Sequence, residues 1–135
     1  MNKLTFLYAG TAALLLAGDQ ISSNQLTERN CVAYLSRLWN LQSEVRLWDG
    51  SRVDLMGDNI VIEVDWARKW AEGVGQATWY SIITGKTGVV VLLVKDWSRE
   101  RHFCYRGLAT GVRSNVLIYP VFMDDIRQRR AIPPP

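Results

Sequence analysis

Residues 52–80 read RVDLMGDNIVIEVDWARKWAEGVGQATWY, which is two strand patterns joined by a tight turn and followed by a helical pattern. Pairing the strands across a turn at residues 58–59 places Asp54 opposite Glu63, with Cβ atoms roughly 5 Å apart. Side-chain alternation then puts Asp54, Glu63 and Asp65 on one face of the hairpin. The sequence therefore predicts that three acids converge on one side of this hairpin.

The opposite face of the hairpin is uniformly apolar, so we expect it in the core. It consists of Val53, Leu55, Ile60, Ile62 and Val64, while Met56 and Val61 share the face of the acids. A solvated hairpin face is the alternative explanation of the acids, because charged side chains are mostly exposed in proteins.

A helix is expected over residues 67–84, with Gly85 as the residue that ends it. One stripe along this helix, at helical spacing, carries polar and small side chains: Lys69, Gly73, Gln76 and Tyr80. The small residues Gly73 and Gly75 indicate that another surface approaches the helix closely.

The flanking segments predict an α/β fold with a mixed sheet. Apolar spacing indicates a first helix within residues 27–41, and alternation indicates strands at 44–48 and 51–56 around an Asp49-Gly50 turn. Residues 88–94 read as a strand covered on both faces, and residues 115–123 as a last strand whose Pro120 favours a sheet edge or a bulge. The expected order is α-β-β-β-α-β-(α)-β, with the bracketed helix in the mixed segment before the last strand.

Composition limits the classes of protein and site. A chain of 135 residues with 48% apolar residues and a net charge of +3 fits one globular domain. Two cysteines and one histidine exclude a disulfide-dense scaffold, a four-cysteine zinc site and a histidine-rich metal site, so a metal would require carboxylate ligands. Cys31 and Cys104 form one bridge if the chain is exported, and are small core residues otherwise.

The first residues form a separate segment, because Lys3 precedes an uncharged run over residues 4–18. Such a run is typical of a signal peptide or a short membrane anchor, here residues 1–23, with a buried first helix as the alternative. The chain is then exported or membrane-anchored, and cytoplasmic if the segment is no signal. The remaining units are a domain over residues 24–126 and a basic, proline-rich tail over residues 127–135.

The motifs Arg52-Val-Asp54-Leu and Ile62-Glu63-Val-Asp65, followed by the helix with Gln76 and Tyr80, resemble the PD-(D/E)XK nuclease superfamily. The resemblance implies a restriction-endonuclease-like α-β-β-β-α-β core, a mixed sheet flanked by helices. It also implies hydrolysis of phosphodiester bonds in DNA, with RNA as the alternative, using Mg²⁺ or Mn²⁺. Asp54 and Glu63 would be the metal ligands, Asp65 would assist, and Gln76 would position phosphate or water.

The sequence departs from the superfamily at one catalytic position, since Asp65 stands where a lysine is expected. An anion there repels the substrate phosphate and cannot stabilise the charge that develops during cleavage. Lys69 shares a helical stripe with Gln76, and we hypothesise that it supplies the missing cation. The alternative is a solvated residue at the start of a helix.

Other residues are candidates for substrate contact. We expect nucleic-acid contacts from Tyr80, Arg99, Arg101 and Arg106, although a solvated face explains the arginines equally well. Glu44 is either a further metal ligand or the ion-pair partner of Arg46 or Arg52. A homodimer is compatible with the fold, but no dimer surface is identifiable.

Two other functions remain open at this level. One is a nuclease fold without catalysis that acts as a nucleic-acid-binding or interaction module, for which Asp65 in the lysine position is the main support. The other is an exported envelope protein without a nucleic-acid role, which rests on residues 4–18 alone.

Overall fold

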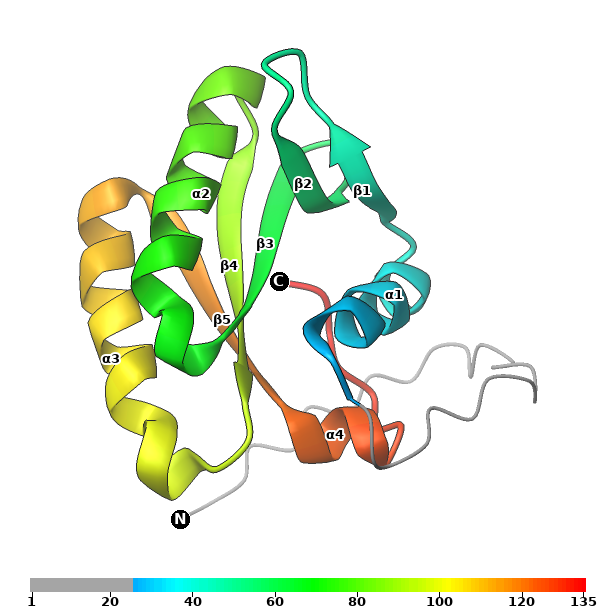
Figure 1. Cartoon of the computed structure of the whole chain (residues 1–135), viewed down its shortest axis with the longest axis vertical. Helices are drawn as coiled ribbons and strands as arrows, with labels where there is room; N and C mark the ends of the chain where they lie inside the picture. Colours follow the sequence, from blue (N-terminus) through cyan, green and yellow to red (C-terminus); the bar gives the residue numbers. More distant parts are fainter. Residues whose placement is uncertain (1–25) are drawn as a thin grey trace.

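A five-stranded mixed sheet is the centre of this computed structural model, which describes residues 26–135 (Figure 1). Its strands follow the chain in the order β1-β2-β3-β4-β5. β2 is antiparallel to both β1 and β3, whereas β4 is parallel to both β3 and β5. Their bounds are Gln42–Arg46, Arg52–Met56, Ile60–Trp66, Thr87–Val94 and Val116–Phe122. The predicted signal or anchor segment lies outside the described residues.

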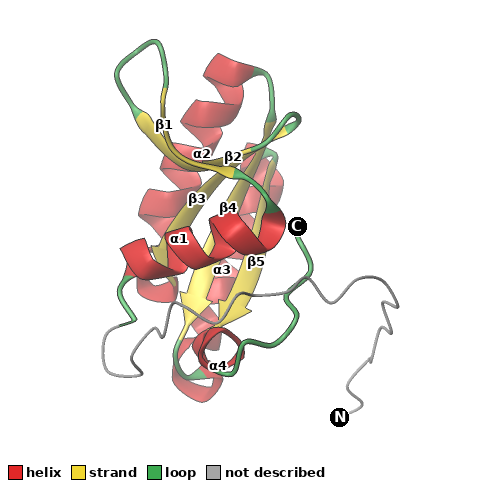
Figure 2. Ribbon diagram, turned by 90° about the vertical axis from the view of Figure 1, so that its right-hand side faces the viewer, coloured by secondary structure: helices red, strands yellow, loops and turns green. Residues whose placement is uncertain are grey.

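Helices cover both faces of the sheet and make a three-layer α/β arrangement. Figure 2 shows α1 and α4 in front of the sheet and α2 and α3 behind it. The helices are α1 (Glu28–Trp39), α2 (Trp70–Thr84, preceded by the 3-10 turn η1, Ala67–Lys69), α3 (Trp97–Ser114) and α4 (Met123–Arg127). The predicted element order is confirmed, including the helix before the last strand, and the short α4 is an addition to it.

Side chains at the helix ends explain where the helices begin and stop. The hydroxyl of Thr27 accepts the Asn30 N–H at 3.2 Å at the start of α1. The Asp96 carboxylate accepts the Ser98 N–H at 2.9 Å at the start of α3, so each helix has one terminal donor satisfied. Gly85 ends α2 with φ of 69°, the left-handed conformation that glycine adopts without strain.

The core consists of two layers, one on each side of the sheet. One cluster joins α1 and α4 to the sheet and contains Cys31, and the other joins α2 and α3 to it and contains Cys104. β4 contributes to both clusters, which confirms the expectation of a strand covered on both faces. Because the sheet separates the two cysteines, both are buried free thiols and the expected alternative of a bridge is wrong.

The predicted hairpin register is confirmed where β2 meets β3, since Leu55 pairs with Ile62 and Met56 with Val61. The prediction that one face holds every apolar residue is wrong for Val53. This side chain packs with Val61 and Tyr80 beneath α2, whereas Leu55 packs toward α1.

The strand pairing is irregular on both sides of Asp54. Glu44 lies between two regular pairs of the β1–β2 ladder, Ser43–Leu55 and Val45–Val53, and has φ of 57°. The β2–β3 pairs also stop at Leu55–Ile62, so this ladder is interrupted before Val53. Asp54, at this interruption, accepts the Val64 N–H of β3 at 2.9 Å through its carboxylate.

The end of the chain packs on the domain. The Trp39 indole N–H donates to the Ile132 carbonyl at 2.8 Å, and the Tyr119 hydroxyl donates to the Pro133 carbonyl at 2.6 Å. The expected basic tail therefore contacts α1 and β5, and its first residue belongs to α4. β5 is an edge strand, as its proline predicted.

Within residues 26–135, no helix combines the length and apolar character needed to cross a membrane.

Candidate active site

Six of the predicted site residues line one pocket of about 440 Å³ between α2, the start of α1 and the first three strands. They are Asp54, Glu63, Asp65, Lys69, Gln76 and Tyr80. The acids come from β2 and β3, and the other three from η1 and α2. The acids predicted from strand pairing and the residues predicted from helical spacing therefore line the same pocket.

The acids of β3 are buried, so the alternative of a solvated hairpin face is wrong for them. Glu63 is 7% exposed and Asp65 is 2% exposed, and they are the buried charged residues of the part that the structure describes. The reason is α2, which packs along β3 and β4 and leaves a pocket over these side chains.

Gly73 allows α2 to approach the acids closely. A Cβ atom at this position would lie 2.8 Å from Val90 Cγ1 and 3.3 Å from Asp65 Oδ2. The expected close approach is therefore confirmed at Gly73. It is wrong at Gly75, where a Cβ atom would meet nothing within 4 Å.

Three buried oxygens of the pocket have no hydrogen-bond partner. These atoms are Glu63 Oε2, Asp65 Oδ2 and Gln76 Oε1. Among the described residues, the other buried side-chain atom without a partner is the hydroxyl of Tyr34, which does not line this pocket. A buried polar atom without a partner destabilises the fold by about 1–3 kcal/mol, so a bound cation, a water or a proton on a carboxyl group would stabilise this pocket.

Burial and mutual repulsion disfavour the charged forms of the carboxyl groups in the pocket. Burial, followed by the charges of Asp54 and Asp65, raises the pKa of Glu63 to about 9. Burial raises the pKa of Asp65 to about 7, with Glu28 adding to the rise and Lys69 opposing it. Burial raises the pKa of Asp54 to about 6, against the hydrogen bond from Val64. A divalent cation among these carboxylates would remove their mutual repulsion.

Lys69 is the cation that the structure places beside the buried acids. Its Nζ lies 3.6 Å from Asp65 Oδ1, and its side chain remains 41% exposed. The neighbouring Asp65 raises the pKa of Lys69, which keeps the ammonium protonated. Lys69 therefore lines the pocket together with Gln76, as the shared stripe predicted.

The other candidates for substrate contact divide into two groups. Tyr80 lines the pocket, but its hydroxyl donates to the Arg52 carbonyl at 3.0 Å. The arginines of α3 do not line it: Arg99, Arg101 and Arg106. Arg99 pairs with Asp96 at 3.5 Å, and a nucleic-acid role for the three stays a prediction.

Glu44 pairs with Arg52 at 2.7 Å and lies outside the lining of the pocket. The ion-pair alternative for Glu44 is therefore confirmed. An acid from the start of the chain's first helix also lines the pocket: Glu28, the first residue of α1. No sequence pattern indicated Glu28, because its position depends on how α1 packs against the sheet.

Four further lining residues were missing from the sequence-based site. Glu72 lies three positions after Lys69 and four before Gln76, so helical spacing could have found it. The others are Arg46, Ser51 and Arg52, which flank the turn between β1 and β2. Arg46 and Arg52 therefore add two cations to the pocket, at the opposite end from Lys69.

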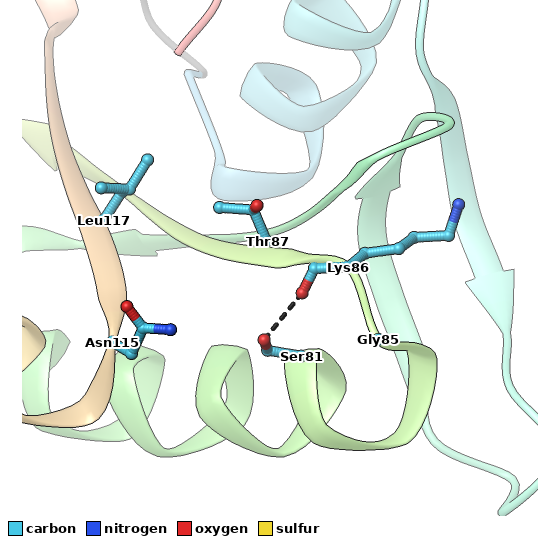
Figure 3. Close-up of a pocket in the computed structure, with 6 residues that line it drawn as sticks. All are labelled: Ser81, Gly85, Lys86, Thr87, Asn115 and Leu117. Carbon is cyan, nitrogen blue, oxygen red and sulfur yellow. Dashed lines mark hydrogen bonds between the residues drawn. The ribbon is translucent and has the colours of Figure 1, made fainter.

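A second pocket, of about 280 Å³, lies where α2 ends near the starts of β4 and β5 (Figure 3). The Ser81 hydroxyl donates to the Lys86 carbonyl at 2.7 Å. The Lys86 ammonium donates to the carbonyls of Gly57 and Asp58 in the β2–β3 turn. This pocket contains no buried acid and no unpartnered polar atom among its lining residues, so it lacks the chemistry of the first.

No three His, Cys, Asp or Glu side chains within residues 26–135 are arranged as a ready metal site, so a divalent cation here would have to keep most of its waters. Mg²⁺ is usually bound through one or two carboxylates and keeps several waters. Glu63 Oε2 and Asp65 Oδ2 are oxygens of this kind, and both lack partners.

No family model, curated protein or solved structure matches the chain.

Proposed function

We propose that the protein is a metal-dependent nuclease that hydrolyses phosphodiester bonds in DNA. The observation that carries the proposal is the set of three buried, unpartnered oxygens, on Glu63, Asp65 and Gln76, in one pocket with Lys69. A phosphodiester is an anion, so cleavage among carboxylates requires cations that neutralise it. The pocket has a lysine at one end and carboxylate oxygens suited to Mg²⁺ or Mn²⁺ beside it.

The fold supports the same proposal. The order α1-β1-β2-β3-α2-β4 agrees with the α-β-β-β-α-β core that the resemblance to the PD-(D/E)XK superfamily implies, and α3 and β5 extend it. In this proposal, Asp54 on β2 and Glu63 on β3 correspond to the two superfamily acids. Glu28 adds a carboxylate from the first helix to the same pocket.

Each residue has a distinct expected task. Glu63 and Asp65, with Asp54, would hold Mg²⁺ or Mn²⁺, which when bound polarises a phosphoryl oxygen and activates a water. The Lys69 ammonium would stabilise the negative charge that grows on the phosphate during the reaction. The Gln76 amide would orient the phosphate or the attacking water.

Lys69 compensates for Asp65 in this proposal. Asp65 replaces the expected cation with a carboxylate, and the ion pair at 3.6 Å returns a positive charge to the same place. The partly exposed ammonium is able to turn from Asp65 toward a bound phosphate. If this compensation fails, the chain is a nuclease fold without catalysis.

The test combines calorimetric titration of Mg²⁺ with nicking of supercoiled plasmid, using the full chain. Glu63→Ala is expected to lose both metal binding and nicking. Lys69→Ala is expected to keep metal binding but to lose about 10²- to 10³-fold in nicking rate, because one charge-stabilising donor is removed.

Two controls carry comparable changes outside the pocket. Asp58→Asn neutralises an exposed acid in the β2–β3 turn, and Arg68→Ala removes an exposed cation next to Lys69 in sequence. Both are expected to bind Mg²⁺ and nick plasmid at the wild-type rate. A wild-type protein that binds Mg²⁺ but leaves DNA intact would favour the non-catalytic module. Normal nicking by Lys69→Ala would remove Lys69 from the mechanism.

A further inference from the structure

Trp48 is an exposed aromatic side chain in the turn that joins β1 to β2. It is 81% exposed, the largest value among the exposed large hydrophobic residues of the described chain. Its neighbour Leu47 points inward and packs with Val53 and Tyr80. Leaving an indole in water forgoes stabilisation that burial would supply, and the exposed face of this indole is accessible to a ligand.

Hydrogen bonds fix the turn that carries Trp48. Asp49 Oδ1 accepts the N–H of Ser51 at 3.0 Å and its hydroxyl at 2.6 Å, and the Gly50 N–H donates to the Leu47 carbonyl at 3.0 Å. Asp49 Oδ2 accepts the indole N–H of Trp79 at 2.8 Å, which ties the turn to α2. Figure 1 shows this turn at the top of the molecule beside the last turns of α2. The turn therefore holds the indole of Trp48 outside the fold.

The turn borders the cationic end of the active-site pocket. Arg46 and Arg52 flank Trp48 in sequence and line the pocket, and Tyr80 marks this end through its bond to the Arg52 carbonyl. Lys69 marks the other end, beside Asp65. The eleven helical steps from Lys69 to Tyr80 span about 16 Å at 1.5 Å per residue, enough for a stretch of backbone longer than one nucleotide.

We propose that Trp48 stacks on an unpaired base of single-stranded DNA whose neighbouring phosphates contact Arg46 and Arg52. The inference rests on the proposed function, because it places the phosphate to be cut at the carboxylate end of the same pocket. Bases within a duplex are stacked on one another, so their faces are accessible to an indole only in single strands, ends or splayed nucleotides. The predicted substrate class is therefore DNA with single-stranded character.

The arginines near the tryptophan are the reason to propose a nucleic acid as the occupant. Arg46 and Arg52 lie on the same short hairpin as Trp48 and line the pocket, and phosphates follow each base of a strand at regular spacing. Arg52 is paired with Glu44 at 2.7 Å, so a phosphate that contacts Arg52 would replace this carboxylate. An indole with adjacent guanidinium groups is the combination that binds single strands by stacking and charge.

The test is fluorescence anisotropy of the full chain in the Glu63→Gln background, so that no strand is cut. The probes are a fluorescein-labelled oligothymidine of about 16 nucleotides and a duplex of equal length. Adding Trp48→Ala is expected to weaken single-strand binding about 5- to 150-fold, the range for loss of one stacked base. Trp48→Phe keeps an aromatic face and is expected to restore most of the affinity. Tyr105→Ala, which removes a 58% exposed aromatic residue from α3, is expected to change nothing.

The outcomes separate this inference from the nuclease proposal. Unchanged single-strand affinity in Trp48→Ala overturns the inference and leaves cleavage by the wild type as a separate result. An equal loss for the duplex overturns the assignment to unpaired bases. Self-association that depends on Trp48, without oligothymidine binding, overturns it in favour of a protein partner. If the wild type does not nick plasmid, yet binds single strands through Trp48, the stacking surface stands and the nuclease proposal falls.

Discussion

Replacing Glu63 with Gln is expected to remove a pH dependence of stability that burial creates. Burial and the charges of Asp54 and Asp65 raise the pKa of Glu63 from 4.5 to about 9. Between pH 4.5 and about pH 9, Glu63 keeps a proton in the folded protein that it has released in the unfolded chain. The contribution of Glu63 is therefore fully present below about pH 4.5 and is lost progressively as the pH rises toward 9.

The size of this loss in the free energy of unfolding follows from the shift in the pKa of Glu63. Three pH units above the ordinary pKa, near pH 7.5, the free energy of unfolding falls by up to about 4 kcal/mol through this group, at 1.36 kcal/mol per unit. Glu63→Gln has no proton to keep, so its free energy of unfolding is expected to be flatter over this range by up to that amount. The glutamine retains the volume of the side chain, so packing is nearly unchanged.

Urea denaturation followed by tryptophan fluorescence, in EDTA at about pH 4.5 and pH 7.5, measures the difference. The chain contains six tryptophans as reporters. The control is Asp58→Asn, an exposed acid outside the pocket, which is expected to follow the wild-type profile. Saturating Mg²⁺ should stabilise the wild type by about 2.7 kcal/mol at a hundred times its Kd, and Glu63→Gln by less. Parallel profiles for the wild type and Glu63→Gln, to within about 0.5 kcal/mol, would refute the reasoning.

Three further changes test how the site is built. Gly73→Ala should destabilise the fold by about 1–3 kcal/mol, because its Cβ would overlap a valine of β4. Gly75→Ala on the same helix has open space and should stabilise it by about 0.5–1 kcal/mol, and equal effects in urea denaturation would contradict the packing. Tyr80→Phe removes the donor to a backbone carbonyl and should cost about 1 kcal/mol in the same assay, and no loss would mean that water replaces this bond. Cys31 and Cys104 should react with a thiol reagent only after unfolding, and a bridged form in a non-reducing mass measurement would contradict their separation by the sheet.

Local periodicity in the sequence was sufficient to predict much of the site. The pairing of Leu55 with Ile62 follows from a tight turn and strand alternation, which are properties of neighbouring residues. The stripe of Lys69, Gln76 and Tyr80 follows from helical spacing in the same way. Asp54, Glu63 and Asp65 were therefore predictable as a group from the sequence of one hairpin.

Long-range packing decided the rest, because it depends on contacts between segments far apart in the chain. The α2 helix buries Glu63 and Asp65, and that burial, more than the presence of the acids, raises their pKa values. The docking of α1 brings Glu28 to the pocket, and the sheet separates the two cysteines. Val53 lies on the other face from Leu55, beyond the point where the β2–β3 pairing stops, which no alternation rule predicts. The residue types of the site and their order along the chain belong to the sequence, whereas their burial, their charge balance and their missing partners arise only when the helices close over the sheet.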